Sequence, residues 1–249
     1  FSTTYEIDQK YGTEYHQRFR KWLKYVQEND LCIVGAMTDV KGHRGKAPSE
    51  QSDPDMFVHV VERRKDGIVV RGAKAHQTGG ANSHEMLIMP TLRMREADKD
   101  YALSCAIPMD AKGVILIYGR QSCDTRKLEG GDIDVGNCNF CGQEVLTILD
   151  DVFVPWDRVF MCGEFDFSIM LVERFAAYHR QSYGGCKPGI SDVLIGAVSS
   201  IAEYNGVRQA AHIRDKLAEM IHLAETMYSC GLACSYEGWK TMAGNYQTG

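Results

Sequence analysis

The sequence predicts an α+β protein in which an antiparallel β unit lies between an N-terminal helical segment and a C-terminal helical bundle. Three observations predict this order. Apolar residues first recur at helical spacing, then fall into short alternating runs separated by turn residues, and return to helical spacing after Pro155. A run of strands flanked by helices is typical of the α+β class. We therefore expect three parts, residues 1–30, 31–163 and 164–249.

The N-terminal part contains an amphipathic helix over residues 13–29. Thr13 is the expected N-cap, and Asn29 with Asp30 is expected to end the helix. The apolar residues recur at steps of three and four and therefore form one packed face: Tyr15, Phe19, Trp22, Leu23 and Val26.

The middle part consists of short strands. The expected strands are residues 31–37, 57–62, 68–74, 86–89, 101–107, 114–118, 144–149 and 152–154. Two polar runs follow strands, at residues 38–45 and 76–85. Loops of this kind can place backbone N–H groups and a cation against a phosphate or a flavin carbonyl, and the alternative is a surface connection with solvated charges.

The C-terminal part has three long segments of helical period, residues 167–182, 190–204 and 207–237. The first is expected to stop at Gly184-Gly185, because glycine commonly ends a helix. Small residues in the second suit close helix packing or an oligomer contact: Ala197, Ser199, Ser200 and Ala202.

The composition excludes several classes of protein. The chain has 249 residues, of which 44% are hydrophobic and 24% charged, as in ordinary globular proteins. The formal net charge of −5, with basic residues spread among acidic ones, argues against nucleic acid and anionic membranes as partners. No apolar run is long enough to span a membrane, and the chain shows no export signal. We expect a cytoplasmic protein.

Nine cysteines are many for this length, but their odd number and irregular spacing do not suit a secreted disulfide scaffold, so we expect reduced thiols. Cys138-x-x-Cys141 has no second pair and no surrounding βαβ pattern, and we interpret it as a loop feature. Cys230 and Cys234 lie four apart on an apolar helix and are expected in its core. Because the chain begins at Phe1 without a Met, we expect it to be a piece of a longer protein.

Residues 174–189 contain several side chains that could bind a metal or transfer a proton. His179, a glycine turn and Cys186 can converge on one ion, and imidazole with thiolate suits zinc, copper or an iron–sulfur cluster. A His and a Cys at this spacing can equally bind nothing. Tyr183 lies on the same helical face as His179 and is either a surface group or a proton donor beside that imidazole.

Two further residues, Lys187 and Glu144, each have alternative roles. Lys187 could lower the pKa of the neighbouring Cys186 thiol or hold a carbonyl oxygen, although a lone lysine is usually solvated. Glu144 enters an apolar strand, so its carboxyl group is either paired or has a raised pKa that suits general acid–base catalysis near neutral pH.

Four motifs resemble the 4-hydroxybutyryl-CoA dehydratase family. They are Met37-Thr38-Asp39 with Lys41-Gly42-His43-Arg44, Gly72-Ala73-Lys74-Ala75-His76-Gln77-Thr78-Gly79, Tyr118-Gly119-Arg120-Gln121-Ser122-Cys123-Asp124-Thr125-Arg126, and Tyr178-His179-Arg180-Gln181-Ser182-Tyr183-Gly184-Gly185-Cys186-Lys187. The resemblance covers essentially the whole chain. It implies the acyl-CoA dehydrogenase architecture, with an antiparallel β-barrel domain between helical domains, and kinship with the 4-hydroxyphenylacetate 3-monooxygenases.

The resemblance also implies FAD, a four-iron four-sulfur cluster with one histidine and three cysteine ligands, and a homotetramer. His179 and Cys186 match two of these ligands, and the other two cysteines lie in the family upstream of the position of Phe1. The chain alone is therefore expected to hold an incomplete cluster and to be inactive. The implied FAD-binding residues are Met37, Thr38, Asp39, Lys41, Arg44, His76, Gln77, Thr78 and Gly79.

The reaction implied by the resemblance removes water from 4-hydroxybutyryl-CoA to give crotonyl-CoA, and it also isomerises vinylacetyl-CoA. The β C–H bond is too weakly acidic for direct deprotonation, so one-electron oxidation by FAD acidifies it and an iron acts as Lewis acid for the hydroxyl. The resemblance makes His179 a candidate base, Tyr183 and Glu144 candidate proton carriers, and Thr78 with Lys187 neighbours of the flavin. The alternatives are a flavin-dependent aromatic monooxygenase of the same fold and a non-catalytic assembly subunit.

Overall fold

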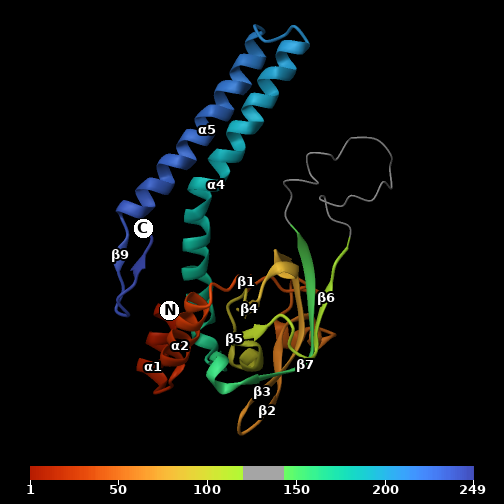
Figure 1. The fold of residues 1–249 in the computed structure, drawn as a ribbon, viewed down its shortest axis with the longest axis vertical. Coiled ribbons are helices and arrows are strands. Elements are labelled where there is room, and N and C mark those ends of the chain that lie inside the picture. Colours follow the sequence, from red (N-terminus) through yellow and green to blue (C-terminus); the bar gives the residue numbers. More distant parts are fainter. Residues whose placement is uncertain (120–142) are drawn as a thin grey trace. The chain divides into compact units, whose positions relative to one another are not determined.

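The computed structural model describes residues 1–119 and 143–249, and the chain divides into two compact units, Phe1–Val172 and Glu173–Gly249 (Figure 1). Residues 120–126 of the third motif, and Cys138 with Cys141, lie outside the described residues. No helix in the described part of the chain is both long and apolar enough to cross a membrane.

The first unit begins with two helices and continues with two four-stranded sheets. The helices are α1 (Ser2–Tyr11) and α2 (Tyr15–Glu28). In order across the first sheet, the strands are β1 (Ile33–Ala36), β4 (Glu85–Ile88), β5 (Leu103–Pro108) and β8 (Val159–Cys162). In the second sheet they are β2 (His59–Arg63), β3 (Gly67–Thr78), β7 (Glu144–Pro155) and β6 (Val114–Ile117). Short 3₁₀-helices occur at Pro48–Glu50, Pro54–Met56, Gly80–Asn82, Glu96–Tyr101, Trp156–Arg158 and Phe165–Phe167.

The N-terminus of α2 is capped from α1. The predicted cap at Thr13 is wrong, because the carboxylate of Asp8 accepts hydrogen bonds from the backbone N–H groups of Tyr15 and His16, both at 2.9 Å. The Thr13 hydroxyl donates to the same carboxylate at 2.5 Å. A carboxylate satisfies two unpaired N–H groups at once and complements the positive end of the helix dipole, which a single hydroxyl does not.

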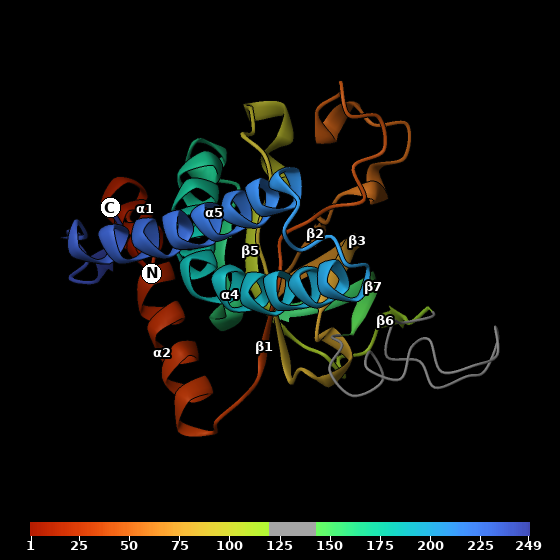
Figure 2. The same ribbon diagram turned by 90° about the horizontal axis from the view of Figure 1, so that it is seen from above.

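The aromatic face predicted for α2 is confirmed. Trp22 packs with Phe160 and Ala106 of the first sheet, and the Phe19 ring meets Phe160 edge to face at 5.2 Å. The Trp22 indole N–H also donates to the buried Glu85 carboxylate at 2.8 Å. Figure 2 shows α1 and α2 together on one side of the sheets.

The predicted β-barrel is wrong, because the described strands form two open sheets. β1 and β8 are the outer strands of one sheet, and β2 and β6 are the outer strands of the other. β1 pairs with β4 in parallel, whereas the other pairs in these sheets are antiparallel. Side chains from both sheets pack into a single core, although the described edge strands of the two sheets do not pair with each other. The core residues include Val34, Ala36, Ile68, Val70, Met86, Ile88, Leu149 and Val152.

Two strands are longer than the sequence predicts, and β8 is not predicted at all. β3 continues to Thr78, so the polar run predicted as a loop from residue 76 begins inside a strand. Residues 144–149 and 152–154 form the single strand β7, which passes Asp151 in a left-handed conformation with φ 51°. β3 and β7 pair along almost their whole length, and this pairing stabilises the additional residues of both strands. Because the pairing partner is distant in the sequence, the local residue pattern does not predict these longer strands.

The second unit contains a long helical hairpin and a small antiparallel strand pair. α4 (Ser168–Tyr204) runs from the first unit into the second, and it is followed by α5 (Ala211–Tyr236), β9 (Trp239–Lys240) and β10 (Tyr246–Gln247).

The predicted helix end at Gly184-Gly185 is wrong, because α4 continues through both glycines. A Cβ at Gly184 would lie 2.5 Å from the Cα of Gly231 in α5, so glycine at these positions lets the two backbones touch. Pro188 lies inside the same helix and cannot donate to the carbonyl four residues before it. α4 changes direction part-way along its length in Figure 1, as expected of a helix that contains proline.

Candidate functional site

The first group of candidate residues lies where the loop after β1 meets β3. The backbones of Asp39 and Lys74 form an isolated antiparallel bridge. The Ala75 N–H also donates to the carbonyl oxygen of Thr38 at 2.9 Å. Three of the predicted FAD residues, from Met37 to Asp39, therefore lie against the strand that carries three others, from His76 to Thr78, with Gly79 directly after it.

A buried ion pair underlies this contact. Lys74 is 2% exposed, and its Nζ donates to Asp39 Oδ1 at 2.5 Å and to the carbonyl oxygens of Met37 at 3.0 Å and Met89 at 2.8 Å. The Thr91 hydroxyl donates to the second carboxylate oxygen of Asp39 at 2.5 Å. Burial lowers the pKa of Lys74, and the negative charge of Asp39 opposes that shift. Both side-chain oxygens of Asp39 thus have protein donors.

The rest of the loop after β1 is held by its own packing. Lys41 and Gly42 have left-handed backbones, with φ of 73° and 44°. The positive φ of Gly42 favours glycine, and a Cβ there would also displace the movable ends of the Met56 and Gln51 side chains, at 2.2 Å and 2.6 Å. Arg44, further along, is exposed and offers a cation at the surface.

The end of β3 presents a second set of polar groups. His76 is exposed and has a left-handed backbone (φ 38°), at a bulge where the pairing of β3 with β7 shifts register. Gln77 is buried, whereas the exposed Thr78 donates its hydroxyl proton to Glu144 Oε1 at 2.5 Å. Glu144 is exposed at the start of β7, and its role in proton transfer stays a prediction. Gly79 follows in a left-handed conformation with φ 74°.

These residues fit FAD. The flavin and pyrophosphate oxygens of FAD accept hydrogen bonds, and strand-end loops supply N–H donors and cations to such groups. Here the exposed donors are the side chains of Arg44 and His76, and a Cβ at Gly79 would meet no atom within 4 Å, which leaves room for a ligand. Which of the predicted residues contacts the cofactor stays a prediction.

The second group of candidate residues forms a stripe along α4. The Tyr183 hydroxyl and His179 Nε2 are hydrogen-bonded at 2.8 Å. The Phe175 ring stacks on the His179 imidazole with 5.5 Å between ring centroids, and the Lys187 Nζ lies 5.2 Å from the centroid of the Tyr183 ring. Steps of four residues place all four side chains on one helical face.

Cys186 lies on nearly the same face as His179, because seven residues are close to two helical turns. Its thiol belongs to an exposed residue. Among the described residues, no three His, Cys, Asp or Glu side chains are arranged to hold a metal ion. His179 and Cys186 are about 10 Å apart along the helix axis. Their role as metal ligands stays a prediction.

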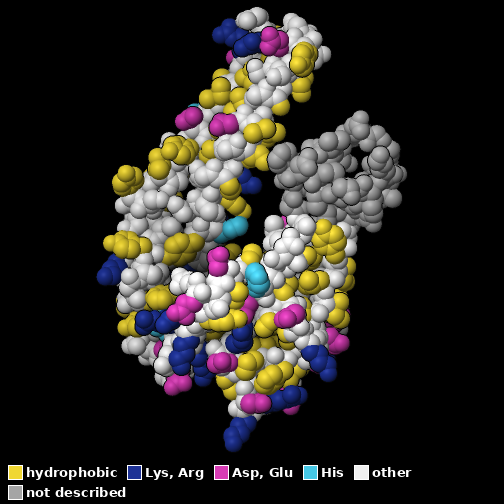
Figure 3. Space-filling model, viewed as in Figure 1, with side chains coloured by type: hydrophobic (Ala, Val, Ile, Leu, Met, Phe, Trp, Pro, Cys, Tyr) yellow, Lys and Arg dark blue, Asp and Glu magenta, His cyan; other side chains and the backbone are white. Residues whose placement is uncertain are grey.

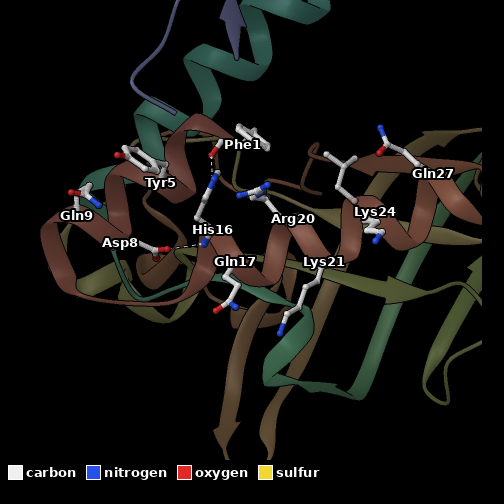
Figure 4. A pocket seen from close by; sticks show the side chains of 11 residues that line it. Phe1, Tyr5, Asp8, Gln9, His16, Gln17, Arg20, Lys21, Lys24 and Gln27 are labelled. Atoms are coloured by element: carbon white, nitrogen blue, oxygen red, sulfur yellow. Dashed lines mark hydrogen bonds between the residues drawn. The ribbon is translucent and has the colours of Figure 1, made fainter. Parts of the chain in front are cut away.

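A groove of about 610 Å³ lies on the N-terminal helices (Figure 4). Its lining includes Asp8 and the cations Arg20, Lys21 and Lys24 of α2. None of the predicted catalytic, FAD-binding or cluster residues lines it. The candidate chemistry therefore belongs to the strand ends and to α4, not to this groove.

Lys74 and Glu85 are among the buried charged groups of the first unit that are not predicted from the sequence. Lys74 has a signal, because it shares the alternation phase of Ile68 and Val70, which are fully buried in the same strand. Glu85 has no comparable local signal: its carboxylate accepts from the Trp22 indole and pairs with Arg158 at 2.7 Å, and both partners are distant in the sequence.

Comparison with known proteins places the chain in a family. A sequence model described as the N-terminal part of 4-hydroxyphenylacetate 3-hydroxylase matches residues 1–161, and one for its C-terminal part matches residues 169–248. The chain is 66% identical over 248 residues to the 4-hydroxybutyryl-CoA dehydratase/vinylacetyl-CoA-Δ-isomerase of Clostridium aminobutyricum, covering 99% of this chain and 51% of that protein. It is 31% identical over 223 residues to the 4-hydroxyphenylacetate 3-monooxygenase oxygenase component of a Geobacillus strain, covering 84% of this chain and 43% of that protein.

Solved structures agree with the sequence comparison. The oxygen-tolerant archaeal 4-hydroxybutyryl-CoA dehydratase from N. maritimus superposes with a TM-score of 0.90 at 59% identity, over 99% of this chain and 49% of that one. The oxygenase component of 4-hydroxyphenylacetate 3-monooxygenase, complexed with FAD, superposes with a TM-score of 0.83 at 27% identity, over 99% and 51%. A steroid acyl-CoA dehydrogenase at 19% identity, with a TM-score of 0.57, shows the acyl-CoA dehydrogenase-like fold.

The chain spans about half the length of these relatives. The two family matches together extend over nearly all of it, and the similarity to the dehydratases covers the β unit as well as the helical hairpin. The chain therefore belongs to the 4-hydroxyphenylacetate 3-hydroxylase family and is a homologue of 4-hydroxybutyryl-CoA dehydratase.

Proposed function

We propose that the full-length protein dehydrates 4-hydroxybutyryl-CoA to crotonyl-CoA and isomerises vinylacetyl-CoA, with FAD and a His-ligated four-iron four-sulfur cluster. One observation carries the proposal. The His179–Tyr183 hydrogen bond of 2.8 Å lies on the helical face of Cys186, in a chain 66% identical to a protein named for both activities. An imidazole, a phenol and a thiol on one face combine proton transfer with soft-metal ligation.

The reaction sets clear demands on the protein. A proton leaves C2 and another leaves C3, hydroxide leaves C4, and C4 receives a proton, so that the net loss is one water. Bound FAD would supply the transient one-electron oxidation that acidifies the C3–H bond, and cluster iron the Lewis acid for the hydroxyl. The side chains must therefore accept protons from two carbon atoms and return one.

His179 and Tyr183 are the proposed pair that accepts a proton from a substrate carbon atom. The phenol is hydrogen-bonded to His179 Nε2, so a proton can pass between these two atoms without a change of rotamer. The Lys187 ammonium lies over the face of the Tyr183 ring, 5.2 Å from its centroid, in a cation–π contact. Cys186 would serve with His179 as a cluster ligand.

Glu144 and Thr78 are the proposed proton carrier and its orienting partner in the first unit. The Thr78 hydroxyl donates to Glu144 Oε1, which fixes the direction of the carboxylate at the exposed end of β7. The adjoining loops would hold FAD through backbone N–H groups and cations, by the nine predicted residues: Met37, Thr38, Asp39, Lys41, Arg44, His76, Gln77, Thr78 and Gly79.

The proposed homotetramer is supported by apolar surface on the second unit. Large apolar side chains along α4 are strongly exposed, for example Ile190 at 59%, Val193 at 70% and Ile201 at 60%. Figure 3 shows hydrophobic side chains spread along the hairpin of α4 and α5. Many exposed large apolar side chains along one hairpin are typical of surface that becomes covered in an assembly.

Anaerobically purified full-length protein tests the proposal. The wild type should contain FAD, iron and acid-labile sulfide and should form crotonyl-CoA from 4-hydroxybutyryl-CoA. His179→Ala and Cys186→Ala should each lose iron and dehydration while retaining FAD, because neither residue belongs to the FAD loops. Full turnover and iron content in both variants would disprove the cluster assignment. A wild type that holds both cofactors but forms no product would favour a non-catalytic assembly subunit.

A flavin-dependent aromatic monooxygenase is the second candidate. The family description of both matched regions and the FAD-complexed relative at 27% identity favour it. This activity needs no cluster, so the wild type would show flavin absorbance without iron or sulfide. It would also hydroxylate 4-hydroxyphenylacetate when supplied with reduced flavin and oxygen.

A further inference from the structure

Lys74 is a fully buried cation that the proposed chemistry does not use. An ammonium group has three N–H donors, and each one here has an acceptor: the Asp39 carboxylate and the carbonyl oxygens of Met37 and Met89. The cavity around it leaves no space for a water molecule. The group is thus completely satisfied by protein atoms, which suits holding a structure rather than exchanging protons.

The acceptors of Lys74 come from two neighbouring strand ends. β1 and β4 are parallel and in register, from Ile33 opposite Glu85 to Ala36 opposite Ile88. Met37 directly follows β1 and Met89 directly follows β4. One side chain from β3, in the other sheet, therefore ties together the carboxyl ends of both parallel strands.

These contacts of Lys74, together called the tether, extend to the loops beyond the ends of β1 and β4. Asp39 continues from β1 and Thr91 from β4, and the Thr91 hydroxyl donates to the carboxylate oxygen that Lys74 does not occupy. Next to the ion pair, the Ala75 N–H binds the Thr38 carbonyl oxygen. The conformation of residues 37–39 and their distance from the end of β3 are thus both fixed at Lys74.

We propose that Lys74, with Asp39 and Thr91, is a positioning residue for FAD: it pre-forms the loop after β1 so that the cofactor meets an ordered surface. The inference rests on the proposed FAD site. If the tether is removed, FAD binding must itself order residues 37–39. Ordering even one or two residues corresponds to a loss of affinity of about tenfold or more.

The test uses variants of the full-length protein that separate the tether from the fold. Lys74→Met alone would leave Asp39 charged and buried, so the main variant is Lys74→Met with Asp39→Leu, because apolar replacement of a whole buried ion pair is often tolerated. Asp39 is itself a predicted FAD residue, so the positioning role is supported only if Thr91→Val, which changes none of those residues, also weakens FAD binding. Thr91→Val removes only the hydroxyl bond to Asp39. Thr147→Val is the matched control, since Thr147 of β7 is also fully buried, lies opposite Lys74 in the pairing of β3 with β7, and has a hydroxyl without a hydrogen-bond partner among the described residues.

FAD affinity is measured by fluorescence titration of apoprotein, with the vibronic structure of the bound-flavin absorbance band as a second readout. The double variant should raise the FAD dissociation constant about tenfold or more and blur that band, while its far-UV circular dichroism and iron content stay at wild-type values. Thr91→Val should raise the constant about threefold. Thr147→Val should change it by less than about twofold.

Unchanged FAD affinity in a folded double variant would overturn the inference. If that variant does not fold, Thr91→Val decides, and an affinity equal to that of Thr147→Val would count against the tether. A wild type that binds FAD but forms no crotonyl-CoA rejects the proposed reaction and leaves these comparisons intact. A wild type that binds no FAD overturns both.

Discussion

Replacing Gly184 by Ala should separate the two helices of the hairpin. A Cβ at Gly184 would lie 2.5 Å from the Gly231 Cα and 3.2 Å from the Gly231 N, both of which are backbone atoms that cannot rotate away. Ordinary carbon–carbon contact is about 3.5–4.0 Å, so α4 and α5 would have to move apart by about 1 Å at the crossing. Overpacking of this kind costs about 1–3 kcal/mol.

Gly185→Ala is the matched control for this substitution. It lies in the same helix one position later, and a Cβ there would meet no atom within 4 Å. Both variants gain the helix propensity of alanine, about 0.5–1 kcal/mol. The difference between them therefore isolates the packing cost of about 1–3 kcal/mol.

Thermal and urea unfolding of both full-length variants, followed by circular dichroism, measures that difference. We expect Gly185→Ala to be equal to or more stable than the wild type, and Gly184→Ala to melt several degrees below Gly185→Ala, at about 2–4 °C per kcal/mol. Iron content should fall in Gly184→Ala, because His179 and Cys186 flank the crossing. Equal stability of the two variants would refute the backbone contact between Gly184 and Gly231.

Three further predictions concern single side chains. Tyr183→Phe removes the phenol bound to His179 Nε2 and should lower turnover by about 10²–10⁴-fold at unchanged iron content, measured by crotonyl-CoA formation and iron assay; wild-type turnover would exclude Tyr183 as proton carrier. Glu144→Gln should leave FAD and cluster content intact while lowering turnover, and loss of iron would contradict its role as a carrier rather than a ligand. For Asp98, burial raises the pKa but hydrogen bonds from Ser49 and the Arg95 N–H outweigh it, so the pKa is lowered on folding. The stabilisation that Asp98 provides is present above the unfolded-state pKa and disappears as pH falls through the folded-state pKa. Asp98→Asn should therefore have a lower free energy of unfolding than the wild type at neutral pH and nearly the same one at low pH, as measured by urea titration. An equal loss of stability at both pH values would contradict this.

The periodicity of the sequence predicts most strands and helices because each pattern is local. The aromatic face of α2 and the alternating residues of β3 report burial directly, since one face of each element meets the core. The ends of elements are less predictable, because they depend on partners. Asp8 caps α2 across a turn, and β3 extends to Thr78 only because β7 pairs with it along its length.

The two glycines between the proposed cluster ligands also depend on a distant partner that a local pattern does not show. Gly184-Gly185 has the composition of a helix end, and the residue that decides the matter, Gly231, lies 47 positions away from Gly184 in the printed sequence. The close approach of the two backbones makes glycine necessary inside the helix. A pattern confined to residues 174–189 cannot distinguish these two uses of the same residue.

The continuity of α4 changes how the proposed ligands are held. If a glycine turn separated His179 from Cys186, cluster binding would have to order that turn and would lose affinity in doing so. In a continuous helix, both side chains start from a rigid backbone at a fixed separation, and the Tyr183 hydroxyl is already hydrogen-bonded to His179 between them. Backbone contact at Gly184 braces this part of α4 against α5. In the proposed cluster site, the helix would therefore contribute two pre-positioned side chains, and cluster assembly would not have to order this part of the chain.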